Sequence, residues 1–160
     1  MQSFYPRPAQ PWGELEAADS QARRRATRVA LEPLDGSPVW RAACLVPRGC
    51  TSTYGCLARL LGHGWCPQTV GQALKRNPHA PEVPCHRIVR ADGTLGGYFG
   101  GAGADDPRVR TKVRLLREEG VRLQAAGAAP PRVHASCMWR FPPGADWRAV
   151  RLPGERSSGA

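Results

Sequence analysis

Cys85 and His86 are neighbours in the sequence, and this pair of residue types can carry out nucleophilic chemistry. The attacking species must be a thiolate, and an ordinary cysteine with a pKa of about 8.5 is only a few per cent ionised at pH 7. His86 can accept the thiol proton, directly or through a water molecule, and Arg87 can fix backbone or charge nearby. The pattern therefore indicates a buried nucleophilic thiol.

The same pair also has a structural interpretation. A cysteine in an apolar run is usually a small core residue, and an adjacent histidine can simply be structural. In an ideal strand, neighbouring side chains point to opposite faces and would be kept apart. Pro84 lacks an N–H and favours irregular backbone here. The pair alone leaves both interpretations open.

The chain before the pair has the hydrophobic spacing of three short helices. Val39, Ala42, Ala43 and Val46 recur at intervals of three and four, which predicts a helix from Pro38 that ends at Pro47. A residue among 51–53 can cap a second helix with an apolar face of Leu57, Leu60 and Leu61, and a third helix is predicted over 67–75. Two short helices joined by a glycine-containing turn are a helix-turn-helix candidate. Lys75 and Arg76 at the end of its second helix favour a role in DNA binding.

The chain after the pair is predicted to be mixed in structure. Residues 83–89 are interpreted as a strand or strand-like segment, and Asp92-Gly93 is a hairpin signal. Residues 96–101 are too rich in glycine for a stable strand. Residues 102–107 are then a linker to a helix over 108–119, with Val109, Val113 and Leu116 inward and Gly120 as its C-cap.

Composition limits the class of protein. The 160 residues include 23 Lys and Arg against 13 Asp and Glu, and the net charge of +10 favours a polyanionic partner. No apolar run approaches the 18 or so residues of a membrane span, so no membrane association is expected. The six cysteines contain no Cys-x-x-Cys pair, so we expect reduced thiols and no metal. A zinc site is a less favoured alternative, and its ligands would be Cys44, Cys50, Cys56 and Cys66.

The sequence predicts one domain with tails. We expect a disordered basic N-terminal segment over 1–30, which includes Arg23-Arg24-Arg25 as a candidate nuclear-import or phosphate-binding patch. The predicted domain covers 31–125, a C-terminal add-on covers 126–142, and a disordered tail covers 143–160. The first residues have neither the apolar stretch of a secretory signal nor the acid-poor composition of a transit peptide.

Several ordered motifs resemble one protein family. They are Val46-Pro47-Arg48-Gly49, Thr53-Tyr54-Gly55, Asn77-Pro78, Pro84-Cys85-His86-Arg87, Gly96-Gly97-Tyr98 and Leu115-Leu116-Arg117-Glu118-Glu119-Gly120-Val121. Together they closely resemble the active-site and DNA-binding domain of the 6-O-methylguanine-DNA methyltransferases, over roughly residues 38–123. These suicide enzymes move an alkyl group from the guanine oxygen to their own cysteine.

The resemblance implies a fold and a chemistry. The expected fold is a small α+β domain, mostly helical, with a winged-helix-like helix-turn-helix beside a cysteine-bearing strand. Cys85 would be the nucleophile, His86 would take its proton through a water, and Glu119 would orient His86. Asn77 would hold the turn before the nucleophile. The thioether product would be stable, so the protein would act once and without a cofactor.

The resemblance also implies a partner and a way of binding it. The partner would be double-stranded DNA that contains 6-O-alkylguanine, bound by a monomer through the minor groove, in the nucleus of a eukaryote or otherwise in the cytoplasm or nucleoid. The damaged nucleotide would be extruded from the stack at a cost of a few kcal/mol. Backbone groups of Cys85, Ile88 and Phe99 would read the guanine edge. The full expected set for substrate and DNA is Tyr54, Gln68, Gly71, Leu74, Lys75, Arg76, Arg87, Ile88, Tyr98 and Phe99.

Two departures from the family pattern stand out. Gln68 occupies the position at which the family usually has an arginine that fills the gap left by the extruded base. Glutamine can hydrogen-bond to the orphaned cytosine but brings no charge, so we expect weaker flipping or altered preference. The N-terminal domain of longer members is mostly absent, and a structural zinc housed there is not expected.

Two other functions remain as alternatives. An alkyltransferase-like damage sensor would bind the lesion without reacting, but such proteins typically replace the nucleophile with tryptophan, and this chain keeps Cys85. Gln68 is the feature that leaves the sensor open. An unrelated Cys-His hydrolase lacks an obvious oxyanion-hole motif here and leaves the helix-turn-helix unexplained.

Overall fold

The predicted helices form, although the first ends at Cys44 and not at Pro47, and the last has Glu119 and not Gly120 as its C-cap. The computed structural model describes residues 36–126 and 129–155. Helix α3 (Ser37–Cys44) has a proline in its first turn. In front of α4 (Tyr54–Leu61), the Thr53 side chain accepts a hydrogen bond from the Cys56 N–H at 3.1 Å. Helix α5 (Pro67–Lys75) is fastened at its start by Thr69, whose hydroxyl accepts from the Cys66 N–H at 2.9 Å.

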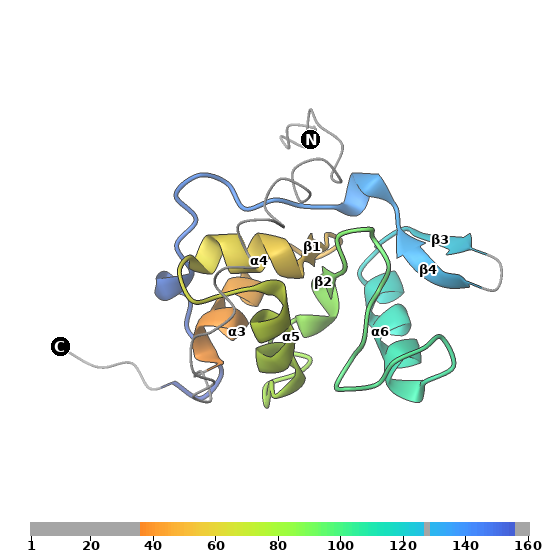
Figure 1. Cartoon of the computed structure of the whole chain (residues 1–160), viewed down its shortest axis with the longest axis horizontal. Helices are drawn as coiled ribbons and strands as arrows, with labels where there is room; N and C mark the ends of the chain where they lie inside the picture. Colours follow the sequence, from red (N-terminus) through yellow and green to blue (C-terminus); the bar gives the residue numbers. More distant parts are fainter. Residues whose placement is uncertain (1–35, 127–128, 156–160) are drawn as a thin grey trace.

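Helices α4 and α5 form the predicted helix-turn-helix, and α3 packs against both (Figure 1). The turn between them contains Gly62 and Gly64 at φ of +82° and +87°, a conformation that glycine adopts without steric cost. The Trp40 indole N–H donates to the Ala73 carbonyl at 2.9 Å and so joins α3 to α5. The apolar faces meet in one core whose fully buried members include Val39, Leu57 and Val70.

Two small sheets accompany the helices. Strands β1 (Ser52–Thr53) and β2 (Ile88–Val89) pair in parallel, and β3 (Leu123–Ala126) and β4 (Ala129–Val133) form an antiparallel hairpin. In Figure 1, β1 and β2 lie between the helix-turn-helix and α6 (Pro107–Glu118), with the hairpin beside α6. The α+β class predicted from the sequence is confirmed.

The cysteine does not lie in a strand, which corrects the predicted cysteine-bearing strand over 83–89. Cys85–Arg87 form a 3-10 turn, η1, and β2 begins only at Ile88. The Arg87 N–H donates to the Pro84 carbonyl at 2.9 Å, and the Ile88 N–H donates to the Cys85 carbonyl. Because Pro84 has no N–H to donate to a ladder, the backbone turns here before the strand starts.

The turn predicted over residues 90–93 forms, but the Asp92-Gly93 hairpin signal does not lead to a two-stranded hairpin. The Asp92 carboxylate accepts from the Thr94 N–H at 2.9 Å, and Gly93 has φ +81°. The Arg90 N–H donates to the Thr94 carbonyl at 2.9 Å across the turn, whereas β2 itself pairs in parallel with β1. The pairing partner of β2 is therefore a strand that lies far away in the sequence.

The C-terminal segment is ordered as far as the structure describes it, which corrects the prediction of disorder over 143–155. Its Trp147–Ala149 form a 3-10 turn, η3, and Leu152 is buried in the core that α3 helps to form. The Arg41 guanidinium from α3 bonds the Val150 carbonyl and the Glu155 carboxylate. Sparse apolar residues without periodicity carried no signal for this packing.

Some predictions fall at the limits of the described chain. Residues 1–30, Arg23-Arg24-Arg25 and the last five residues lie outside the described residues. The predicted boundary between residues 125 and 126 falls within β3, and the domain limits stay predictions. No helix in the described ranges has the length and apolar character needed to cross a membrane.

Candidate active site

A cavity of about 140 Å³ lies where the first turn of α4, helix α5 and the loop 97–100 approach Cys85. Its walls contain residues that the sequence predicted for substrate binding, namely Tyr54, Gly71, Leu74, Lys75, Tyr98 and Phe99, together with Gly97 and Gly100. The structure therefore brings together residues that lie up to 46 positions apart in the sequence, from 54 to 100. Gln68 and Arg76 are exposed on or next to α5 and do not line the cavity.

The Cys85 thiol in the cavity wall is only 6 % exposed. Burial raises its pKa above the ordinary value, and hydrogen bonds from Asn77 and Tyr98, with the charge of Lys112, reverse only part of that rise. The resting cysteine is therefore a protonated thiol. A base must remove the proton before the sulfur can attack.

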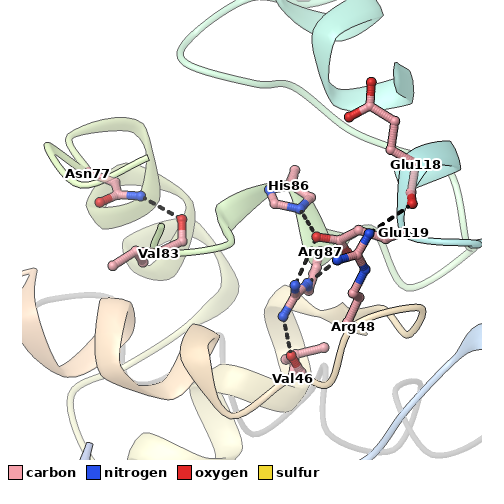
Figure 2. A network of polar contacts seen from close by, with 8 residues as sticks. All are labelled: Val46, Arg48, Asn77, Val83, His86, Arg87, Glu118 and Glu119. Carbon is pink, nitrogen blue, oxygen red and sulfur yellow. Dashed lines mark hydrogen bonds and ion pairs between the residues drawn. The ribbon is translucent and has the colours of Figure 1, made fainter. Parts of the chain in front are cut away.

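His86, the next residue, is hydrogen-bonded to Glu119 (Figure 2). The imidazole is 2 % exposed, and its Nε2 lies 2.8 Å from the Glu119 Oε1. Burial lowers the pKa of His86 below its ordinary value, although Glu119 opposes this. A neutral ring that donates its Nε2 proton to Glu119 keeps a lone pair on Nδ1. Among the described residues Nδ1 has no hydrogen-bond partner, so it is available to accept a proton.

Arg87 fixes Glu119 from the other side. Its Nε and Nη2 donate to the two carboxylate oxygens at 2.8 Å each, and its Nη1 donates to the Val46 carbonyl at 2.7 Å (Figure 2). Burial opposes ionisation of Glu119, but the hydrogen bonds from Arg87 and His86 lower its pKa below the ordinary value. Two parallel hydrogen bonds from one guanidinium fix the orientation of the carboxylate and also stabilise its negative charge.

In this structure Arg87 has internal partners, and its assignment to the DNA-binding set stays a prediction. All three of its bonds are internal, and its side chain is 16 % exposed. Ile88 is likewise fully buried and outside the cavity lining. The Ile88 N–H donates to the Cys85 carbonyl, and the Ile88 carbonyl accepts from the Lys112 Nζ. Both backbone groups therefore already have internal partners.

Asn77 holds the connection between α5 and η1. Its Nδ2 donates to the Val83 carbonyl at 3.1 Å (Figure 2). Its Oδ1 accepts from the His79 N–H at 2.9 Å. The side chain is 5 % exposed and also hydrogen-bonds with Cys85, which lowers the pKa of the thiol. Asn77 thus lies where the sequence predicted, against backbone beside the nucleophile.

Lys112 is the functional candidate that the sequence analysis missed. The side chain is fully buried, and its Nζ donates to the carbonyls of Ile88, Leu95 and Gly97 at 2.6, 2.6 and 3.3 Å. Burial lowers the pKa of Lys112 to about 7. A signal was present, because residue 112 falls on the same helix face as Val109 and Leu116. A lysine in such a position is ordinarily assumed to reach solvent.

The glycine-rich loop is held in a tight conformation beside the pocket. Phe99 has φ +48°, which is unusual for an aromatic residue. A Cβ on Gly97 would lie 2.6 Å from the Gly101 carbonyl oxygen, so only glycine fits there. Strained backbone conformations of this kind are common at ligand-binding sites.

No group of three or more His, Cys, Asp or Glu side chains in 36–126 and 129–155 is close enough to hold an ion. Cys44, Cys50, Cys56 and Cys66, the alternative zinc ligands, form no disulfide with any described cysteine.

Comparison with known proteins places the chain in a family. Residues 37–121 match the family model described as 6-O-methylguanine DNA methyltransferase, DNA binding domain. Methylated-DNA–protein-cysteine methyltransferases of Methanothermobacter thermautotrophicus and Salmonella typhimurium are 44 % identical over 79 residues and 42 % identical over 85 residues. These matches span 49 % and 53 % of this chain but only 40 % and 46 % of those proteins.

A solved structure is also similar. Atl1 of S. pombe, in complex with damaged DNA containing O6-carboxymethylguanine, has a TM-score of 0.57 and 27 % identity, covering 70 % of this chain and all of that one. The family model covers more than half of the chain. The matched residues include the motifs around Cys85 and the helix-turn-helix of α4 and α5. The chain belongs to the 6-O-methylguanine DNA methyltransferase family through its DNA-binding domain.

Proposed function

We propose that this protein repairs DNA by moving an alkyl group irreversibly from the O6 atom of a damaged guanine to the sulfur of Cys85. The observation that carries the proposal is a thiol in a cavity wall, next to a buried histidine that is hydrogen-bonded to a paired carboxylate. The names of the curated relatives support DNA repair as the setting.

The proposed reaction needs one proton transfer and one displacement. The Cys85 proton passes through a water to Nδ1 of His86, and the resulting imidazolium is stabilised by Glu119. The sulfur then forms a bond to the alkyl carbon as the bond from that carbon to O6 breaks. The electron pair stays with the guanine, which takes up a proton. Water does not hydrolyse the C–S bond of the resulting thioether, so the thiol is not regenerated. Each protein molecule therefore reacts once and needs no cofactor.

The cavity supports capture of an extruded nucleotide by a monomer on double-stranded DNA. A guanine inside the stack cannot present O6 to a thiol, so it must be flipped into a pocket. Lys75 at the cavity edge and the exposed Gln68 and Arg76 lie on or next to the same helix. We propose that this helix enters the minor groove, where contacts depend mainly on backbone and shape. Binding should weaken as salt rises, because phosphate contacts release counterions.

A non-enzymatic damage sensor is the second candidate. The Atl1 structure favours it, because the whole of that chain is covered at a TM-score of 0.57. Gln68 also favours it, because it departs from the arginine expected in the enzymes. Cys85 with His86, Glu119 and Asn77 favours the transferase, since a sensor has no use for an activated thiol.

The deciding experiment is the intact mass of the protein after incubation with a duplex that contains one 6-O-methylguanine. A transferase gains one methyl group on Cys85, and Cys85→Ala gains none. An unmodified protein that still retards the damaged duplex in a gel would replace the transferase with the sensor.

Tyr54 tests the base-flipping part of the proposal. The Tyr54 ring lines the cavity and lies against Gly71 of α5. Tyr54→Ala should slow repair of duplex DNA by about tenfold or more, while the reaction with free 6-O-benzylguanine changes less, because the free base needs no extrusion. Single-turnover rates measure both, with Tyr54→Phe as the control that keeps the ring. Equal losses on the two substrates would contradict a role in flipping.

A further inference from the structure

Cys50 and Cys137 lie opposite each other, where the chain before β1 meets the segment after the β3–β4 hairpin. The next residues, Thr51 and Met138, form an isolated parallel bridge. The Thr51 N–H donates to the Cys137 carbonyl at 2.7 Å, and the Trp139 N–H donates to the Thr51 carbonyl at 2.7 Å. These two bonds fix the register, so the two cysteines are the pair one step earlier.

The bridge also brings the backbones of the two cysteines close together. The Thr51 hydroxyl contacts the Met138 sulfur at 3.3 Å, so those two side chains share a face. Cys137 ends the 3-10 turn η2 (Ala135–Cys137), and each cysteine directly precedes a bridge residue, so the two backbones are neighbours at this pair. Cα atoms of neighbouring parallel chains are about 5 Å apart, which is inside the range of roughly 4.4–6.8 Å that a disulfide spans.

Contacts with the end of α6 place the two cysteines together independently. Gly49 is packed so closely that an added Cβ would lie 3.1 Å from the Glu119 carbonyl oxygen. The Cys137 sulfur accepts from the Arg122 N–H at 3.3 Å. Burial raises the pKa of the Cys50 thiol, and Cys137 adds to that rise, as expected of adjacent thiols. Gly49, the neighbour of Cys50, and Cys137 therefore both border residues 119–122.

We propose that Cys50 and Cys137 are a redox modification site that closes to a disulfide by exchange with a low-molecular-weight disulfide such as oxidised glutathione. Cys50 is partly exposed and Cys137 is buried, so Cys50 reacts first. Its thiolate attacks the glutathione disulfide, forms a mixed disulfide and releases one glutathione thiolate. The Cys137 thiolate then displaces the second. The two protein thiols lose two protons and two electrons, and these convert one glutathione disulfide into two glutathione thiols.

The closed bond has a predictable effect on the fold. It would link two points that enclose the helix-turn-helix, the pocket and α6. A cross-link over so long a loop restricts the unfolded chain, so the oxidised protein should unfold at a higher temperature than the reduced one. Cys85 takes no part in this chemistry, and the proposal stands or falls separately from alkyl transfer.

Peptide mapping of the full chain tests the proposal. The reduced protein is incubated with oxidised glutathione, its free thiols are blocked with iodoacetamide under denaturing conditions, and it is digested with trypsin. We expect a cross-link between the peptides 49–59 and 133–140, which dithiothreitol reverses. Peptide 49–59 also contains Cys56, so Cys56→Ser should keep the cross-link and Cys50→Ser should abolish it.

The matched control is Cys44→Ser, because Cys44 is another partly exposed thiol in the neighbourhood of Arg87. This variant should form the cross-link as the unaltered protein does. Glutathione attached to Cys50 while Cys137 stays free would overturn the proposal. So would a cross-linked form whose melting temperature falls below that of the reduced protein, because the native chain would then not accommodate the bond.

Discussion

Glu118 and Glu119 are adjacent residues that the fold uses in different ways. The Glu119 side chain is 12 % exposed and lies between His86 and Arg87, whereas Glu118 is 53 % exposed and pairs with the solvent-exposed Arg114. An exposed ion pair contributes little to stability, but a buried carboxylate that keeps another charge in place is costly to remove.

The two glutamates make a matched pair of variants. Glu119→Gln should slow alkyl transfer about 10- to 100-fold and lower the free energy of unfolding by about 2–3 kcal/mol, because the Arg87 charge loses its partner and His86 loses its anionic acceptor. Glu118→Gln should change the free energy of unfolding by less than about 0.5 kcal/mol and should transfer the alkyl group at the rate of the unaltered protein. Single-turnover kinetics and urea unfolding measure both effects. A normal rate for Glu119→Gln would remove Glu119 from the mechanism.

His86 gives the molecule a pH dependence of known sign. Burial lowers its pKa in the folded state, while a histidine in the unfolded chain keeps the ordinary value of about 6.5. Below that pH the unfolded state binds a proton that the folded state does not. The free energy of unfolding should therefore decrease between about pH 7.5 and 5.5. Urea unfolding at the two pH values measures the decrease, and His86→Gln should show a smaller one. An equal slope in this variant would assign the effect to other groups.

Helix α6 is the element that joins the thiol, the pocket loop and the carboxylate. Val109, Lys112 and Leu116 lie buried along one face, and Glu119 caps its end. Through Lys112 the helix bonds β2, which follows η1, and the loop that carries Tyr98. A small shift of this helix would therefore disturb His86 and the cavity wall together.

Lys112→Met tests whether α6 holds β2 and the pocket loop in place through this side chain. Methionine fills similar space but leaves the carbonyls of Ile88, Leu95 and Gly97 without their donor. The free energy of unfolding should fall by about 2–4 kcal/mol, with relief of the buried ammonium offsetting part of the loss. Transfer should slow as well, because the pocket loop loosens. The exposed Arg110→Met on the same helix is the control and should change stability by less than about 0.5 kcal/mol. A Lys112→Met protein as stable as the original would mean that the carbonyls find other donors.

At the scale of the whole molecule, the C-terminal segment completes the core of the domain. It follows β4, passes the bridge at Thr51 and reaches α3, where Leu152 is buried and Arg41 bonds its backbone. Figure 1 shows this segment running from the hairpin back to the far side of the helix-turn-helix. The segment extends beyond the family match, which ends at residue 121.

Leu152→Ala tests that packing. Truncation of a buried leucine should lower the free energy of unfolding by about 2–3 kcal/mol. The exposed neighbour Arg151→Ala should change it by less than about 0.5 kcal/mol. Denaturant midpoints at constant m-value measure the difference. An unchanged midpoint for Leu152→Ala would mean that the segment does not share in the folded core.

The sequence by itself determined the local elements and the residue types of the site. Caps such as Thr53, the glycines between α4 and α5, and the apolar spacing in each helix act over a few residues, so they can be read without a fold. Cys85, His86, Asn77 and Glu119 were named from their motifs, and the structure gathers them at one site.

Only the tertiary structure decided how distant segments use these residues. Glu119 binds Arg87 from 32 positions away, Lys112 reaches carbonyls 15 to 24 positions away, and Leu152 packs with α3. The 3-10 turn at Cys85 and the parallel pairing of β2 were misassigned for the same reason. Propensity and periodicity describe what a segment favours alone, whereas the partner of a buried charge or a short strand depends on which segments the whole fold brings beside it.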